Sequence, residues 1–94
     1  MISNKMEFSI REGQPEDMKS VHKLIKELAI YENEPDAVKI SVDDLIEDGF
    51  GDQPEFELLV AEINEIIVGI ALYYKRYSTW KGRTLHLEDL IVNK

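Results

Sequence analysis

The spacing of apolar residues changes once along this chain, near Phe56, and this change constrains the fold more than any other feature. Before it, apolar side chains between residues 18 and 29 recur every three or four positions, which is typical of an amphipathic helix. After it, β-branched and aromatic residues are concentrated in the runs 58–63, 66–77 and 84–92. The chain is therefore predicted to combine a helical first half with three consecutive strands.

Short local signals complete the predicted order of elements. Phe8 to Arg11 alternates apolar and polar residues as a strand does, and Pro15 with neighbouring acids begins the first helix. Ser41 is followed three residues later by Asp44, which is the spacing of a helix N-cap and predicts a short second helix. Asn64-Glu65 is predicted to form a tight hairpin turn between the second and third strands.

This order of elements is that of an α+β domain. Sequential strands joined by short turns form an antiparallel meander, and two helices would pack on one of its faces. Ninety-four residues, of which 44% are hydrophobic, are enough for one core. We therefore expect residues 1–94 to form a single β-α-α-β-β-β domain, with a mainly antiparallel sheet packed by two helices.

The charge of the chain is uneven. Its formal net charge is −8, and residues 27–65 contain thirteen acids against a single base, Lys39. Because nucleic acid is bound mainly through phosphates that lysine and arginine neutralise, it is not expected as a partner. A cationic ligand fits this field better. The simpler explanation is that the acids keep a small domain in solution.

Several kinds of site are excluded by what the sequence lacks. It contains no cysteine, which removes disulfides, thiolate nucleophiles and cysteine-ligated zinc. His22 and His86 lie far apart with no ligand-like spacing, so no metal site is expected. The longest apolar stretch, 66–74, is too short to span a bilayer, and residues 1–8 lack a signal region. We therefore expect a cytoplasmic protein without a membrane partner.

The outer edge of the predicted last strand is apolar and uncovered. Its apolar run Leu90-Ile91-Val92 is followed in this sequence by Asn93-Lys94, and no later element covers its outer edge. Exposed apolar edge strands tend to pair with another chain. The sequence therefore predicts either a homodimer through residues 84–92 or the front half of something larger.

Five short segments of the chain form a recognisable series. They are 24–32 (LIKELAIYE), 47–51 (EDGFG), 59–62 (LVAE), 77–83 (YSTWKGR) and 87–92 (LEDLIV). Taken together and in this order, they resemble the diamine/thialysine acetyltransferase branch of the GNAT superfamily, over about Phe8 to Val92. The resemblance implies the GNAT fold, acetyl-CoA as the acetyl donor and a small primary amine as the acceptor.

The sequence departs from the family at its end. Family members continue past this strand into a glycine-containing loop, whose backbone amides at a helix N-terminus hold the CoA pyrophosphate. A later tyrosine resembles a general acid for the leaving thiolate. Neither feature is present in these 94 residues. The resemblance therefore implies the N-terminal half of the GNAT fold, inactive by itself.

Glu88 is the candidate catalytic residue. An ammonium, whose pKa is about 10, must lose a proton before the amine attacks a thioester, and a carboxylate can accept it. On an ideal strand Leu85, Leu87 and Asp89 share one face. His86 and Glu88 share the other. The resemblance places Glu88 at the amine-binding position with Asp89 beside it; without the resemblance, they are acids on a half-exposed strand.

The resemblance implies a wider site as well. Tyr31 and Glu32, which end the first helix, correspond to contacts with the substrate amine, and Trp80 corresponds to a residue that lines the substrate tunnel. Each also has a structural explanation: Tyr31 would pack on the core beside a solvated Glu32, and Trp80 would cover the core. The residues expected to contact acetyl-CoA are Leu90, Ile91 and Val92.

Two functions follow from these observations. The first is the amine-binding half of an acetyl-CoA-dependent N-acetyltransferase. Ser78 stands where polyamine-specific relatives have an acid, which favours a shorter amine such as thialysine over spermidine. The alternative is a small, acidic, non-catalytic domain that dimerises through its last strand and binds cations or a partner chain.

Overall fold

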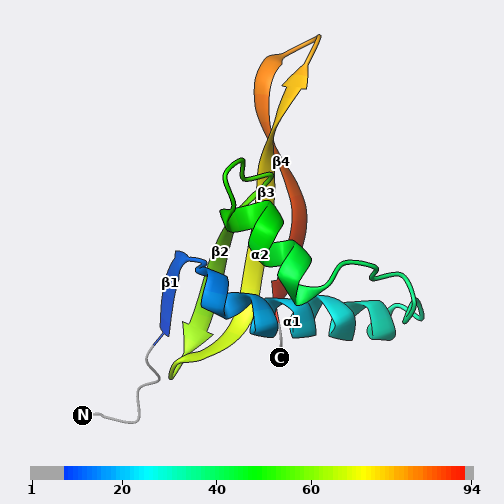
Figure 1. The fold of residues 1–94 in the computed structure, drawn as a ribbon, viewed down its shortest axis with the longest axis vertical. Helices are drawn as coiled ribbons and strands as arrows, with labels where there is room; N and C mark the ends of the chain where they lie inside the picture. Colours follow the sequence, from blue (N-terminus) through cyan, green and yellow to red (C-terminus); the bar gives the residue numbers. More distant parts are fainter. Residues whose placement is uncertain (1–7, 93–94) are drawn as a thin grey trace.

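One four-stranded sheet carries two helices on one face in the computed structural model, which describes residues 8–92 (Figure 1). The strands are β1 (Phe8–Glu12), β2 (Glu57–Ile63), β3 (Ile66–Ser78) and β4 (Gly82–Val92). They lie in the order β1-β2-β3-β4, and each is antiparallel to its neighbours. The predicted α+β arrangement with an antiparallel sheet is confirmed.

The two helices lie between β1 and β2 in the chain. A single 3₁₀ turn, Pro15–Asp17, leads into α1 (Met18–Tyr31), and α2 spans Val42–Phe50. The predicted cap of α2 is present, because Ser41 Oγ accepts the Asp44 N–H at 3.0 Å and the Asp44 carboxylate accepts the Ser41 N–H at 2.9 Å. These reciprocal bonds satisfy two backbone donors that the helix itself cannot.

The core lies between the helices and the inner face of the sheet. α1 and β2–β4 supply most of its buried side chains, and α2 contributes one. The residues of this cluster are Met18, Val21, Leu24, Leu45, Leu58, Val60, Ile70, Leu72 and Ile91. Within residues 8–92, no helix covers the opposite face of the sheet, which exposes apolar side chains such as Ile10 and Leu90.

Local turn chemistry sets the register of β2 and β3. Asn64 and Glu65 have φ angles of 52° and 69°, the left-handed conformation that a two-residue hairpin turn requires at both positions. Ile63 is therefore paired with Ile66, and the two strands run back along each other. The predicted hairpin at this position is confirmed.

β3 and β4 extend far beyond the helices as a twisted two-stranded arm (Figure 1). We define the arm as residues 74–87. It accounts for the elongated shape of the molecule, whose longest dimension is 53 Å against 31 and 26 Å for the others. Trp80 is in the connection at its tip and is 94% exposed.

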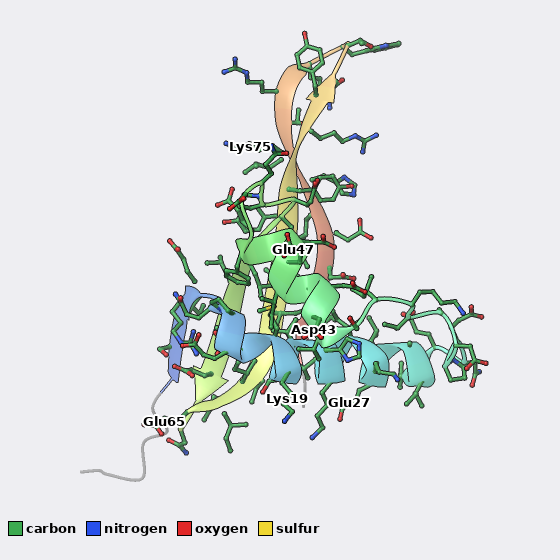
Figure 2. All side chains as sticks on the ribbon, viewed as in Figure 1. Lys19, Glu27, Asp43, Glu47, Glu65 and Lys75 are labelled. Atoms are coloured by element: carbon green, nitrogen blue, oxygen red, sulfur yellow. The ribbon has the colours of Figure 1, made fainter. Side chains whose placement is uncertain are left out.

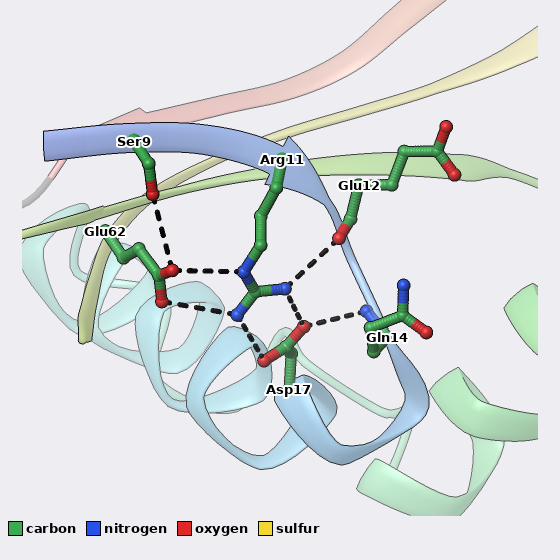
Figure 3. Close-up of polar contacts among 6 residues, drawn as sticks. All are labelled: Ser9, Arg11, Glu12, Gln14, Asp17 and Glu62. Atoms are coloured by element: carbon green, nitrogen blue, oxygen red, sulfur yellow. Dashed lines mark hydrogen bonds and ion pairs between the residues drawn. The ribbon is translucent and has the colours of Figure 1, made fainter.

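A charged cluster joins β1, β2 and the start of α1 (Figure 3). The Arg11 guanidinium donates to both Asp17 carboxylate oxygens, at 2.8 and 3.0 Å, and to both Glu62 oxygens, at 3.1 and 3.3 Å. The Gln14 N–H also donates to Asp17, at 2.7 Å. Asp17 is buried, and the bonds from Arg11 lower the pKa of both carboxyl groups.

Within residues 8–92, no helix is both long and apolar enough to cross a membrane. The cytoplasmic location stays a prediction.

Candidate functional site

A β-bulge in β4 centres the candidate site on Glu88. Tyr73 of β3 is paired with Leu87, whereas the preceding residue, Leu72, is paired with Asp89. Glu88 is therefore the extra residue of β4 and has no partner in the β3–β4 pairing. Bulges of this kind redirect side chains and are frequent beside active sites.

The bulge corrects the predicted distribution of side chains on this strand. Asp89 does not share a face with Leu87, because the two are paired with consecutive residues of β3, which point to opposite faces. Asp89 instead lies on the face of the buried Leu72, the face that the helices cover. Strict alternation of side chains along the sequence cannot predict the face of Asp89, because one additional residue moves every later side chain of the strand to the opposite face.

Glu88 lies beside His86, as predicted. The His86 Nε2 atom is 3.6 Å from Glu88 Oε1, and Arg76 Nη1 is 3.3 Å from His86 Nδ1. Arginine can only donate, so Nδ1 is the acceptor in this contact, and Nε2 is the ring nitrogen that faces the carboxylate. The Tyr74 ring packs on the imidazole with its centroid 5.0 Å away. Two neighbouring side chains, Arg76 and Tyr74, thus hold the ring that faces Glu88.

Asp89 differs from Glu88 in its surroundings. It is half-buried, and burial raises the pKa of its carboxyl group; the nearby Glu88 charge raises it further. Two adjacent carboxyl groups in unlike environments are a common arrangement where protons are exchanged. This pair can attract an ammonium group and accept a proton from it.

The other predicted substrate contacts lie elsewhere in the structure. Tyr31 ends α1 and is 84% exposed, Glu32 caps that helix, and Trp80 is at the tip of the arm (Figure 1). In the part of the chain that the structure describes, no hydrogen bond or ion pair joins these residues to one another or to Glu88. The structure brings together Glu88, Asp89 and His86, but not Tyr31, Glu32 or Trp80.

The residues predicted to contact acetyl-CoA are divided between the two faces of β4. Ile91 is buried in the core against the helices, whereas Leu90 and Val92 are each 69% exposed on the opposite face. Leu90 and Val92 border a groove of about 400 Å³ on that face, lined entirely by apolar residues and glycine. None of its lining residues could hold a pyrophosphate.

Sequence reasoning missed Arg76 and Tyr74 as neighbours of His86. The turn at 78–82 contained the necessary signal, because counting back from Ser78 and forward from Gly82 places Tyr74 opposite His86 and Arg76 opposite Thr84. Among residues 8–92, the structure contains no group of three or more His, Cys, Asp or Glu side chains that could hold a metal ion.

Comparison with known proteins identifies relatives that are named as N-acetyltransferases. No family model matches the chain. Thialysine N-epsilon-acetyltransferase of Bos taurus is 47% identical over 91 residues, which cover 88% of this chain and 54% of the relative. Spermidine/spermine N(1)-acetyltransferase-like protein 1 of Homo sapiens is 43% identical over 94 residues, which cover 93% of this chain and 14% of the relative. The chain thus spans about half the length of the thialysine relative and less of the second.

Solved structures support the same assignment at the level of the fold. A possible acetyltransferase from Clostridium difficile 630 matches 93% of this chain with a TM-score of 0.68 and 22% identity, over 58% of its own length. An aminoglycoside N-acetyltransferase, AAC(6')-Iy, solved in complex with CoA, matches 99% with a TM-score of 0.69 and 16% identity, over 60% of its length. The predicted fold is therefore confirmed: the chain has part of the fold of these acetyltransferases, and it is related in sequence to the thialysine and spermidine/spermine N-acetyltransferases over part of their length.

Proposed function

We propose that this chain forms the amine-binding part of an acetyl-CoA-dependent N-acetyltransferase whose acceptor is a small primary amine, such as a diamine or thialysine. The observation that carries the proposal is the bulge in β4, which projects Glu88 from the strand beside the half-buried Asp89. The names of the related proteins support the reaction and the class of acceptor.

The proposed chemistry begins with the proton of the ammonium. Glu88 accepts this proton, directly or through one water, and the negative charge of the Glu88–Asp89 pair holds the cation before transfer. His86 lies beside Glu88, with its Nε2 atom 3.6 Å from the carboxylate. Acetyl-CoA supplies the acetyl group as a thioester: the amine nitrogen forms the new bond to the carbonyl carbon, and the carbon–sulfur bond breaks.

Titration of the isotope-labelled chain with a diamine tests the amine site. We expect the amide signals of residues 86–89 to shift and saturate, and the response to weaken with salt, because an exposed ionic contact is screened. Glu88→Gln should weaken binding about threefold or more, as expected for loss of a partly exposed ion pair. Glu65→Gln, an equal charge change at the β2–β3 turn, is the matched control and should change nothing.

Two results would count against the amine site. One is a titration in which other residues respond and residues 86–89 do not. The other is an equal loss of binding in the two glutamine variants, which would favour the alternative of a general affinity of this acidic domain for cations. A response at Tyr31 and Glu32 as well would extend the site to the end of α1.

Turnover is a separate test. These 94 residues, assayed alone, should transfer no measurable acetyl group, because they contain no loop for the CoA pyrophosphate and no general acid for the thiolate. The measurement is release of free thiol from acetyl-CoA in the presence of small amines. Turnover by the purified chain would show that residues 1–94 already contain a complete active site.

A further inference from the structure

One face of the arm connects the candidate site to a cation. In β3, Leu72, Tyr74 and Arg76 are alternate residues and therefore share a face of the sheet. Asp89 is paired with Leu72 and His86 with Tyr74, so both lie on this face as well. The candidate site, His86 and Arg76 thus follow one another along the same face, from the helices toward the tip of the arm.

His86 lies between Arg76 and Glu88 and contacts both. Its Nδ1 atom is 3.3 Å from Arg76 Nη1, and its Nε2 atom is 3.6 Å from Glu88 Oε1. The imidazole ring adds about 2 Å between these contacts, so the guanidinium and the carboxylate are at most about 9 Å apart, roughly one Debye length at physiological salt. A ligand held by Glu88 therefore lies within the field of Arg76.

The Arg76 guanidinium is available to such a ligand. Arg76 is exposed, and in the part of the chain that the structure describes it forms no ion pair with a carboxylate. Its contact with His86 is made by Nη1, and the other guanidinium nitrogens can still donate. Two parallel N–H donors of arginine match the two oxygens of a carboxylate. Arg76 can thus bind a carboxylate while it remains beside His86.

The rest of the arm reinforces this cation. Residues 74–87 contain four bases and no acid. The bases are Lys75, Arg76, Lys81 and Arg83. Figure 2 shows Lys75 near the base of the arm, whereas Asp43 and Glu47 lie on α2. An elongated ligand that extends from Glu88 along the arm therefore meets negative charge at its first end and positive charge at its far end.

We propose that Arg76 is a specificity-determining residue of the amine site. It favours an acceptor that carries a carboxylate at the end remote from its amine, and it disfavours an acceptor with a second ammonium there. The separation of Arg76 and Glu88 is the span of a short aliphatic chain. The inference rests on the proposed function, because it takes Glu88 as the group that holds the amine.

Titration of the isotope-labelled chain with three amines of equal chain length tests the proposal. ε-Aminocaproate ends in a carboxylate, hexamethylenediamine in a second ammonium and hexylamine in a methyl group. Binding is measured at low salt from the amide shifts of residues 86–89. Because the formal net charge of −8 attracts a dication to many places on the surface, the deciding quantity is the ratio of the dissociation constants of the two charged ligands at these residues.

Arg76→Gln should change this ratio. Loss of an exposed ion pair should weaken the binding of ε-aminocaproate about threefold, and loss of the repulsion should strengthen that of hexamethylenediamine about twofold. Hexylamine, which has no charge at its far end, should be affected least. In the parent, the contribution of Arg76 should fade at about 0.5 M salt, because the Debye length becomes shorter than the separation of Arg76 and Glu88.

Arg83→Gln is the matched control. It makes the same change in net charge on the same arm. Arg83 is paired with Tyr77, the neighbour of Arg76 in β3, and therefore lies on the opposite face. This variant should leave the ratio as it is in the parent. Amide spectra that are unchanged outside the arm establish that both variants are folded.

Two results would overturn the proposal and leave the amine site intact. In one, all three amines bind at residues 86–89, but Arg76→Gln leaves the ratio unchanged. In the other, Arg83→Gln changes the ratio as much as Arg76→Gln does, which would indicate a general effect of the charge of the arm. A third result, in which none of the amines shifts residues 86–89, would overturn the amine site and the role of Arg76 together.

Discussion

Replacing Leu45 by alanine is expected to remove about 2–5 kcal/mol from the free energy of unfolding. Leu45 is 2% exposed and is the buried residue of α2. A domain of this length has a free energy of unfolding of about 5–14 kcal/mol, so Leu45→Ala would remove a large part of it. The nine residues of α2 cannot remain helical without this contact, because so short a helix is marginal in water.

Urea unfolding followed by circular dichroism measures the effect. Ile30→Ala, on α1, removes a side chain of the same class that is 60% exposed and should change stability by less than about 0.5 kcal/mol. A loss for Leu45→Ala below about 1 kcal/mol, with an unchanged dependence on urea, would mean that α2 is not anchored through this residue.

The positions of the helices and strands were predictable because their signals are local. The three- and four-residue spacing of apolar side chains indicated α1, Ser41 with Asp44 indicated the start of α2, and Asn64-Glu65 indicated the first hairpin. Each of these depends on residues within one or two turns of the chain. The order of the strands then followed from the short connections between them.

The candidate site was predictable only in part, because it depends on how two strands are aligned. The sequence Leu87-Glu88-Asp89 reads as simple alternation, and the additional residue appears only when β4 is paired with β3. The bulge places Asp89 on the covered face and leaves Glu88 as the unpaired residue. The roles of Glu88, Tyr31, Glu32 and Trp80 stay predictions that the experiments above address.

The cluster of Arg11, Asp17 and Glu62 could not be found from the sequence. Arg11 and Glu62 lie 51 positions apart, and Asp17 becomes buried only when α1 packs on the sheet. Likewise, the length of β3 and β4 was foreseeable, but not that they extend beyond both helices. That outcome depends on where the helices lie on the sheet, which no short segment specifies.

Replacing Arg11 by methionine should lower the midpoint of thermal unfolding by several degrees at neutral pH. The change leaves the buried Asp17 carboxylate without its cation and beside Glu62, another negative charge. Removing one member of such a group is more harmful than removing the charges together. Arg11→Met/Asp17→Asn should therefore recover part of the loss. Lys19→Met, on α1, is the control for the change in net charge.

Arg11→Met should also reverse part of the pH dependence of the free energy of unfolding. In the parent, Arg11 lowers the folded-state pKa of Asp17 and Glu62. Their contribution to stability is therefore present above the unfolded pKa values, about 4, and is lost as the pH falls through the lower folded values. The effect of Asp89 on stability has the opposite sign, because its pKa is higher in the folded state than in the unfolded state. Ionisation of Asp89 therefore lowers the stability as the pH increases from about 4, the unfolded pKa, to the higher folded pKa.

Without Arg11, burial raises the folded-state pKa of Asp17 and the Gln14 N–H lowers it by a smaller amount, so burial prevails. Asp17 then has the same effect as Asp89: both make the folded state more stable in acid. The unfolding midpoint of Arg11→Met should thus fall less than that of the parent, or increase, as the pH is lowered from 7 toward about 4. Thermal unfolding of the parent, Arg11→Met and Lys19→Met across this range measures it. Parallel curves for the three proteins would show that Arg11 does not control the ionisation of Asp17, and that the cluster contributes packing rather than charge pairing.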